Sequence, residues 1–220
     1  MNDFSLYKEH ILHFWNIRFN GLHELKDDFI KYGKVMTYKK NDIIYRKGDR
    51  VNRIYYIQDG LVGASRILEN GNEVYIFMLG KYCIFPDCFY FTRLKIENDM
   101  RFIKDSTVLE FNEESISHLL DNRTFINYLL YSISLKSLLS ADRVHRELSA
   151  TGEEKLLNLL YDLGACSGIE ENGKCTISFT HEELSSMLGM HRTTVSKILS
   201  ELNKKKTIQC SRNKIQFIIN

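Results

Sequence analysis

The sequence has no long hydrophobic run and no paired cysteines. No stretch approaches the run of about 18 apolar residues that a membrane helix needs. The amino terminus has no basic start followed by an apolar core. The five cysteines are widely spread and form no CxxC pair, which argues against a disulfide framework. These absences predict a soluble, cytoplasmic protein with free thiols and no membrane partner.

Histidine is absent from a long part of the chain. None lies between His23 and His118, so this part cannot supply the histidine ligands of a metal-dependent barrel enzyme. Spacing indicates no Ser-His-Asp or Cys-His arrangement either. We interpret His10, His13 and His23 as surface residues rather than ligands to haem or metal. The sequence therefore predicts a protein that is not an enzyme and holds no metal, with a barrel enzyme as the alternative.

The composition is that of a globular protein, but the charge is uneven. Of the 220 residues, 44% are hydrophobic and 26% are charged, and this length fits two small domains. The formal net charge is only +2, yet seven lysines and arginines face three glutamates between Thr180 and Lys214. The carboxyl end is therefore locally basic.

Short alternating segments fill residues 39–112. Pieces such as NDIIYRKGDR, VNRIYYIQDG and LVGASRILENGNEVYIFMLG have the length of strands, and KGD, QDG and ENGN supply residues that tight turns need. ILENGNEV predicts a two-stranded hairpin. The range as a whole predicts a small β-barrel or sandwich, preceded by one or two short helices in the first 35 residues.

Residues 122–150 change to a helical period. A long helix with two apolar faces must cover its own barrel and a second surface, and a copy of itself is the obvious candidate. The alternative is a single core helix without dimerisation. One stripe consists of Ile126, Leu129, Leu130, Ile133, Ser137, Ala141, Val144 and Leu148, and the second face of Leu135, Leu138 and Leu139.

Residues 180–202 predict two helices joined by a tight turn. Thr180 and Glu183 form a capping-box pair that begins the first helix. Gly189 ends it by tolerating the left-handed conformation, and Arg192 opens the second helix. Short hydroxyls and long cations near the start of a helix suit the major groove of DNA. The alternative is an ordinary helical hairpin with solvated charges. The apolar side of the second helix is Val195, Ile198, Leu199 and Leu202.

The flanking segments complete this carboxyl-terminal domain. Glu153 to Leu163 predict an amphipathic helix, and GIEENGKCTISF predicts a loop that enters a strand. TIQCSRNKIQFII alternates Ile208 and Cys210, then Ile215, Phe217 and Ile219, around a turn. This pattern predicts a hairpin wing after the two helices.

Two segments resemble the CRP/FNR family of bacterial transcription regulators. THEELSSMLGMHRTTVSKILSELNKKKTI resembles the family's winged-helix signature, and KGDRVNRIYYIQDGLVGASRILENGNEV resembles its double-stranded β-helix sensor domain. The resemblance covers about residues 20–219. It implies an α+β chain with a jelly-roll (cupin-like) sensor over 1–121, a dimerisation helix over 122–150 and a winged helix-turn-helix over 151–220. It also implies a homodimer on a palindromic DNA operator, and RNA polymerase as a partner if the protein activates.

The resemblance also implies which side chains meet DNA. Arg192 matches the recognition-helix arginine that reads a base pair, and Lys197 takes the place of a later basic residue. Thr193 stands where the cyclic-AMP receptor carries glutamate, so the preferred half-site should differ there, because threonine lacks the carboxylate that accepts from cytosine N4. The predicted DNA-binding residues are Thr180, His191, Arg192, Thr193, Thr194, Ser196 and Lys197.

The predicted sensor departs from the family's cyclic-nucleotide binders. Counted from Gly80, Phe85-Pro86 stands at the place of their Gly-Glu pair and Ile96-Glu97 at the place of their Arg-Ser pair. A carboxylate in place of the phosphate partner repels the ligand, so a cyclic nucleotide is not expected, although Arg93 or Lys95 could compensate.

An iron-sulfur cluster is not expected either. Cys83 and Cys88 supply two thiolates where a cluster normally takes four ligands. They are interpreted as buried core residues, with a redox switch as the alternative.

The effector is therefore expected to be an unidentified small molecule, bound between the barrel and the long helix if the family's layout holds. Two alternatives remain open: that the polar and aromatic residues there simply pack and solvate the helix, and that the regulator needs no ligand. The predicted effector-binding residues are Arg93, Tyr128, Tyr131, Ser132 and Lys136.

Overall fold

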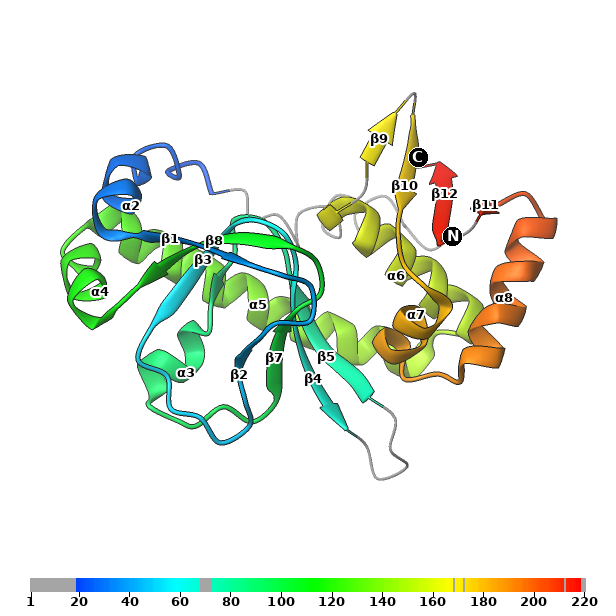
Figure 1. Ribbon diagram of the computed structural model, residues 1–220, viewed down its shortest axis with the longest axis horizontal. Helices are drawn as coiled ribbons and strands as arrows, with labels where there is room; N and C mark the ends of the chain where they lie inside the picture. The colour runs from blue at the N-terminus through cyan, green and yellow to red at the C-terminus, as the bar shows by residue number, and fades with distance from the viewer. Residues whose placement is uncertain (1–18, 68–72, 168, 172, 212, 219–220) are drawn as a thin grey trace. The chain divides into compact units, whose positions relative to one another are not determined.

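The computed structural model describes residues 19–67, 73–167, 169–171, 173–211 and 213–218, and it describes their side chains except at 139, 141–149, 165–167 and 170. By its contacts the chain divides into two units, Met1–Ala64 with Met78–Asp142, and Ser65–Phe77 with Arg143–Asn220. Figure 1 shows the elements of each. Within the described residues, no helix is both long enough and apolar enough to span a membrane.

Strands β1 to β8 form two four-stranded sheets, in the orders β1-β8-β3-β6 and β2-β7-β4-β5. The predicted double sheet is therefore confirmed, as a β-roll. Strand β8 pairs antiparallel with both β1 and β3. The bounds are β1 Lys34–Tyr38, β2 Ile43–Tyr45, β3 Ile54–Asp59, β4 Val62–Ile67, β5 Glu73–Leu79, β6 Ile84–Phe85, β7 Asp99–Phe102 and β8 Ser106–Phe111.

The start of strand β1 differs from the prediction, and the predicted hairpin turn lies outside the described residues. Strand β1 begins before the predicted start at residue 39, because it is an edge strand whose exposed and half-buried residues lack a clear apolar alternation. Strands β4 and β5 are neighbours, as the hairpin prediction requires. The turn of that hairpin, 68–72, lies outside the described residues.

In the part of the chain that the structure describes, four helices accompany the roll: α2 Lys26–Tyr32, α3 Asp87–Thr92, α4 Glu113–Leu120 and α5 Arg123–Ser149. Their shared core is aromatic. The ring of Phe29 on α2 lies 4.7 Å from Tyr56, 5.3 Å from Phe111, 6.1 Å from Phe125 and 6.3 Å from Tyr128, centroid to centroid. These rings tie α2 and α5 to strands β3 and β8.

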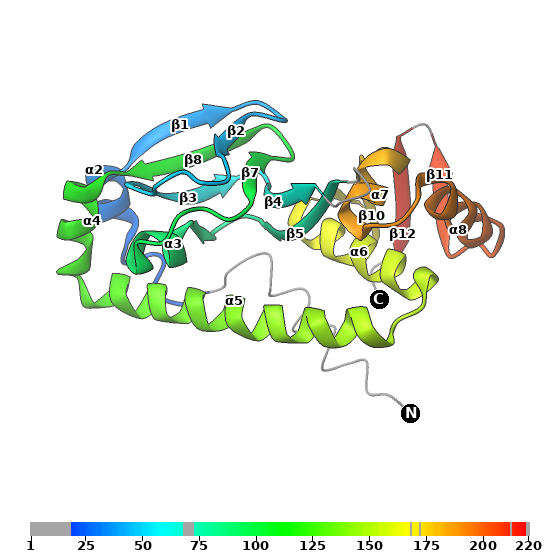
Figure 2. The same ribbon diagram turned by 90° about the horizontal axis from the view of Figure 1, so that it is seen from below.

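Helix α5 is one continuous helix, and its first half runs beside the roll and α3 (Figure 2). Phe125, Tyr128 and Ser132 are buried on the side that faces the roll. Leu129 is only 5% exposed and belongs to this inward face. Placing Leu129 in the same stripe as Leu130 was therefore wrong, since a step of one residue turns a helix by about 100°.

The rest of that predicted stripe is exposed where the structure describes it. Leu130 is 60% exposed, and Ile126, Ile133 and Ser137 are exposed as well. Of the second predicted face, Leu135 is half-buried and Leu138 is exposed. The side chains of Leu139, Ala141, Val144 and Leu148 lie outside the described residues.

The second unit contains α6 Gly152–Ser167, α7 His181–Leu188 and α8 Arg192–Lys204. Its sheet has the order β11-β12-β10-β9, with bounds β9 Ile169–Glu171, β10 Lys174–Ile177, β11 Ile208–Ser211 and β12 Lys214–Ile218. Helix α6 lies close against this sheet, because a Cβ at Gly164 would come within 2.9 Å of both Cys175 and Phe217.

The predicted wing is confirmed as β11 and β12, which pair antiparallel. Ile208, Ile215 and Phe217 are buried, whereas Cys210 is exposed, so the predicted alternation fails at Cys210. Ile219 lies outside the described residues. Residues 169–171, predicted as loop, form the short strand β9, which the apolar pattern missed because it spans only three residues.

Candidate DNA-binding surface and effector region

Local sequence signals set both ends of helix α7, including the turn that leads into α8. Thr180 Oγ1 accepts from the backbone N–H of Glu183 at 3.2 Å, and the backbone N–H of Thr180 donates to the Glu183 carboxylate at 2.7 Å. This is the predicted capping box. Gly189 ends α7 with φ 64°, the left-handed conformation that glycine adopts without strain. Both predictions for this helix are confirmed.

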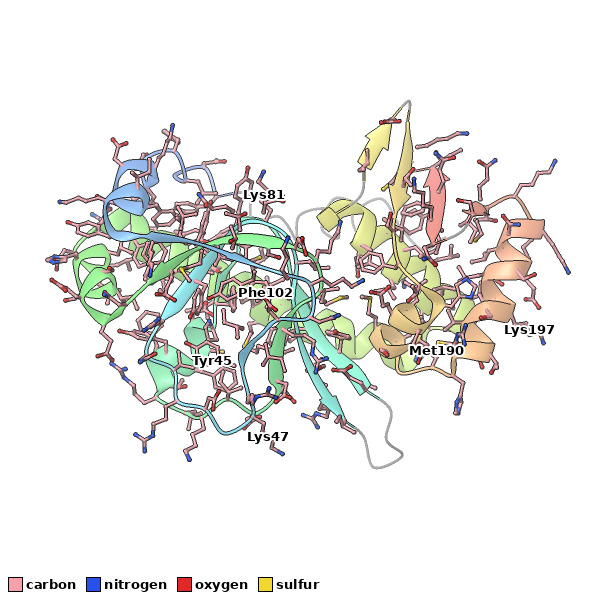
Figure 3. All side chains as sticks on the ribbon, in the orientation of Figure 1. Tyr45, Lys47, Lys81, Phe102, Met190 and Lys197 are labelled. Carbon is pink, nitrogen blue, oxygen red and sulfur yellow. The ribbon has the colours of Figure 1, made fainter. Side chains whose placement is uncertain are left out.

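Helix α8 divides into a buried and an exposed side. Val195, Leu199 and Leu202 are buried and hold the helix against its unit. Arg192, Thr193, Thr194 and Lys197 are exposed, together with His191 at the N-cap. Figure 3 labels Lys197 on the outer side of α8. Long cations and short hydroxyls thus stand together at the start of an anchored helix, which is the arrangement that major-groove reading requires.

Two of the predicted DNA contacts already have partners within the protein. The hydroxyl of Thr180 serves the capping box, where it also lies 2.8 Å from Glu183 Oε2. The hydroxyl of Ser196 is hydrogen-bonded to Nδ1 of His181 at 2.8 Å. These two residues shape the surface by fixing α7 and its contact with α8. Sequence reasoning missed His181, although a ring directly after the N-cap of the first helix was the available signal.

A carboxylate also stands on this surface. Glu182 Oε2 lies 3.6 Å from Nε of Arg192, and both side chains are mostly exposed, at 70% and 68%. Glu182 is one of the three glutamates that the sequence analysis counted against the lysines and arginines between Thr180 and Lys214. A negative group beside the leading arginine is unexpected on a face meant for phosphates.

Comparison with known proteins assigns both parts of the chain. Residues 35–123 match the model of the cyclic nucleotide-binding domain, and residues 154–220 match that of the Crp-like helix-turn-helix domain. The chain belongs to the CRP/FNR family. It is a transcription regulator with a DNA-binding helix-turn-helix, not an enzyme.

Individual relatives agree with this assignment. The global nitrogen regulator of Nostoc sp. (strain PCC 7120) is 24% identical over 190 residues, which cover 82% of this chain and 83% of the relative. TTHA1359, a CRP/FNR-family regulator from Thermus thermophilus, shares the fold with a TM-score of 0.73 at 21% identity, over 84% of this chain and 94% of that one. The c-di-GMP responsive regulator CLP of Xanthomonas campestris gives 0.71 at 16% identity, over 90% and 100%.

The inward face of α5 is bonded through its side chains to residues 82–87. Tyr128 is fully buried, and its hydroxyl donates to the carbonyl of Tyr82 at 2.5 Å. Burial raises the pKa of Tyr128 well above its usual value, so this hydroxyl stays protonated and remains a donor. Tyr128, predicted as an effector contact, therefore serves as a link within the protein.

Lys136 is also committed to this segment. Its ammonium donates to both carboxylate oxygens of Asp87 at 2.8 Å and to the carbonyl of Ile84. The Asp87 side chain is 3% exposed and that of Lys136 is 22% exposed. Since an ammonium has three N–H donors, three acceptors occupy its full capacity. A ligand would have to displace Asp87 or Ile84 to bind Lys136.

The other three predicted effector residues stand in different surroundings. The hydroxyl of Ser132 is fully buried without a hydrogen-bond partner among the described residues. Tyr131 is partly exposed, with the Phe19 ring 5.8 Å away. Arg93 directs its guanidinium to Glu113 at 3.2 Å and to the Tyr90 ring at 4.8 Å. The structure thus gathers Tyr128, Ser132 and Lys136 on one face, whereas Arg93 contacts Tyr90 of α3 and Glu113 of α4.

Cys83 and Cys88 are free thiols in different settings. Cys83 is buried, as predicted, but Cys88 is exposed, so its interpretation as a buried core residue was wrong. Partial burial of its thiol, with the Asp87 carboxylate as a second cause, nevertheless raises the pKa of Cys88. A raised pKa lowers the thiolate population that redox chemistry needs. Among the described residues, no group of three or more His, Cys, Asp or Glu side chains could hold a metal ion.

Proposed function

We propose that this regulator acts in the cytoplasm as a homodimer that reads a palindromic operator and is gated by a small effector other than a cyclic nucleotide. The observation that carries the DNA-reading part is the division of α8. Val195, Leu199 and Leu202 are buried, and Ile198 is half-buried, while Arg192, Thr193 and Lys197 are exposed at its amino-terminal part. In this arrangement Arg192 pairs with a guanine and Thr193 approaches the neighbouring base, once in each half-site.

The exposed stripe of α5 supports the dimer. Ile126, Leu130 and Ile133 are exposed on one side of the helix, with spacings of four and three residues. Apolar side chains at this spacing form the seam of a two-helix coiled coil. Pairing two copies of α5 through this stripe removes the apolar side chains from water and places two recognition helices under one twofold axis.

The contacts of Lys136 support an effector other than a cyclic nucleotide. Neither Phe85-Pro86 nor Ile96-Glu97 provides an arginine for a cyclic phosphate. The nearby ammonium of Lys136 is already neutralised by the buried carboxylate of Asp87. The neighbour CLP is described as c-di-GMP responsive, and the fold alone does not carry that ligand over to this chain.

Gating follows from the same bonds as a population shift. Tyr128 and Lys136 tie α5 to residues 82–87, so an effector that moves this segment also moves α5 and changes how two copies meet. Only one of the resulting states presents the two recognition helices about one helical turn of DNA apart. If the protein activates transcription, RNA polymerase is its further partner.

A regulator that needs no ligand is the second candidate, and one observation favours it. The donors of Lys136 and the hydroxyl of Tyr128 are satisfied within the protein. Two of the predicted effector groups thus need no ligand to complete their hydrogen bonds.

Selection of duplexes from a random pool by the full-length protein tests the DNA-reading proposal. We expect enrichment of a palindrome, with a footprint of about 20 base pairs by extension of the half-site spacing rule. Enrichment of no sequence, with and without cell extract, contradicts the proposal. A thermal-shift screen of metabolites separates the two candidates, because a ligand at 100 times its dissociation constant stabilises the folded state by about 2.7 kcal/mol.

A further inference from the structure

We propose that Glu182 is a positioning residue that sets how Arg192 presents its guanidinium to DNA, and so determines base preference at that position. The inference rests on the proposed reading of a base pair by Arg192. It comes from a carboxylate that the structure places beside the leading arginine of α8, with Glu182 Oε2 3.6 Å from Arg192 Nε.

Glu182 is not needed to build its own helix. The capping box of α7 uses the neighbouring Glu183, whose carboxylate accepts from both the backbone N–H and the hydroxyl of Thr180. Glu182 stands in the same first turn, but its side chain is 70% exposed and directed to α8. Its ion pair with Arg192 is exposed as well, and such pairs add little to folding stability. For folding, this carboxylate therefore adds only the small favourable interaction of a first-turn acid with the helix dipole, which does not require it to face Arg192.

The geometry of the contact gives another reason. An arginine has one N–H at Nε and four at its two terminal nitrogens. It can approach the guanine O6 and N7 acceptors either sideways, through Nε and one terminal nitrogen, or end-on through both terminal nitrogens. A carboxylate beside Nε blocks the sideways approach to guanine. Both terminal nitrogens then stay directed outward as a fork.

The turn fixes the relative positions of the two residues. Glu182 lies in the first turn of α7, and Arg192 is the first residue of α8. The short connection with Gly189 in the left-handed conformation joins these helices, and the bond between His181 and Ser196 holds them together beside the pair. The backbone arrangement thus keeps the two residues within reach of each other.

The carboxylate of Glu182 should also lower the affinity for DNA. A carboxylate near the DNA backbone repels phosphates and lowers binding to every sequence alike. Orientation of Arg192 raises binding only where a guanine accepts both N–H groups. Glu182 therefore lowers affinity for random DNA and raises discrimination at one base pair in each half-site.

The test compares the full-length wild-type protein with Glu182→Ala, Glu182→Gln and Glu201→Ala. The operator is the duplex that the wild type selects from a random pool. Binding of that duplex, of its single-base variants and of a random duplex is then measured by competition at low ionic strength. Glu201→Ala is the matched control, since it removes one exposed carboxylate from α8 about 13 Å along the helix from Arg192.

We expect Glu182→Ala to bind random duplex more tightly and to lose about fivefold or more of the preference at the position that Arg192 reads. Glu182→Gln keeps the size of the side chain but removes the charge that attracts Arg192 across 3.6 Å, so it should keep less of the preference than the wild type and more than Glu182→Ala, while also gaining affinity. Glu201→Ala should leave the preference unchanged.

Three outcomes overturn the inference. If alanine and glutamine at 182 give the same preference as the wild type, Glu182 only repels phosphates. If Glu182→Ala changes the preference at another base pair instead, Glu182 reads that base itself. If Arg192→Ala weakens all sequences equally, or the wild type selects no sequence, the proposed reading by Arg192 has failed and the inference with it.

Discussion

Replacement of Lys136 by methionine should strongly destabilise the sensor. The change keeps much of the aliphatic side chain but removes the ammonium that donates to Asp87 and to the carbonyl of Ile84. The Asp87 carboxylate, only 3% exposed, would be left without its cation. Breaking a buried ion pair by removal of one partner costs about 3 to 5 kcal/mol. Because Lys136 keeps 22% exposure, water can reach the site, and we expect about 3 kcal/mol.

A double-mutant cycle measures the interaction energy between Lys136 and Asp87. The free energy of unfolding of each variant is obtained from urea unfolding, followed by circular dichroism. Asp87→Asn alone should also destabilise, whereas Lys136→Met combined with Asp87→Asn should recover about 2 kcal/mol relative to the sum of the single changes, since no charge is left buried. Protein concentration is held fixed, because dissociation of the proposed dimer would contribute to the transition.

The exposed Lys34 provides the control, and Lys34→Met should change stability by no more than about 0.5 kcal/mol. Two results would refute the reasoning. In the first, the losses of stability from Lys136→Met and Asp87→Asn are additive in the double variant; in the second, Lys136→Met lowers stability by less than about 1 kcal/mol. Either result would mean that the ion pair is effectively solvated.

Four further predictions concern the DNA surface, the dimer, the turn and the thiol. In competition binding, Arg192→Ala should cost about 1 to 3 kcal/mol of operator binding and relax the base preference at one position in each half-site. If Lys197 contacts a phosphate, Lys197→Ala should instead weaken binding to all duplexes alike. In sedimentation equilibrium the wild type should be the proposed dimer and Ile133→Glu a monomer, with the fold unchanged by circular dichroism, because a charge replaces an exposed apolar side chain. A dimer that persists in this variant would place the interface elsewhere. Thr180→Ala should lower the free energy of unfolding by about 1 kcal/mol, and Thr180→Ser should restore most of it, because the cap needs only a hydroxyl; equal losses would point to the methyl group instead. Alkylation of Cys88 by iodoacetamide at neutral pH should be slower than that of a small free thiol and should rise with pH to a midpoint above the ordinary value, because its pKa is raised; a midpoint below that value would contradict the burial argument.

The parts that could be predicted are those encoded over short distances in sequence. The capping box depends on residues three positions apart, the turn depends on Gly189 alone, and the anchoring of α8 follows a helical period. Each of these signals is complete within a few residues, so the helix-turn-helix could be read directly.

Apart from the short strand β9 and the edge strand β1, the missed features depend on residues that are distant in sequence. The bonds from Lys136 to Asp87 span 49 positions, and the bond between His181 and Ser196 spans 15. No local period indicates such pairs. The strand order β1-β8-β3-β6 could not be predicted either, because β1 and β8 are neighbours in the sheet but far apart in the sequence. Leu129 was assigned to the wrong face because both faces of α5 are apolar and a period cannot tell which one meets the roll.

Helix α5 carries its inward bonds and its exposed stripe on adjoining sides of one rod. A rigid rod cannot turn on one side alone, so a roll of α5 about its own axis would shift both sides together. At the outer radius of a helix, about 5 to 6 Å, a roll of about 20° displaces side-chain tips by about 2 Å. A shift of this size can separate side chains that interlock across a helix pair, so a small movement of residues 82–87 would be enough to alter how two copies of α5 pack together.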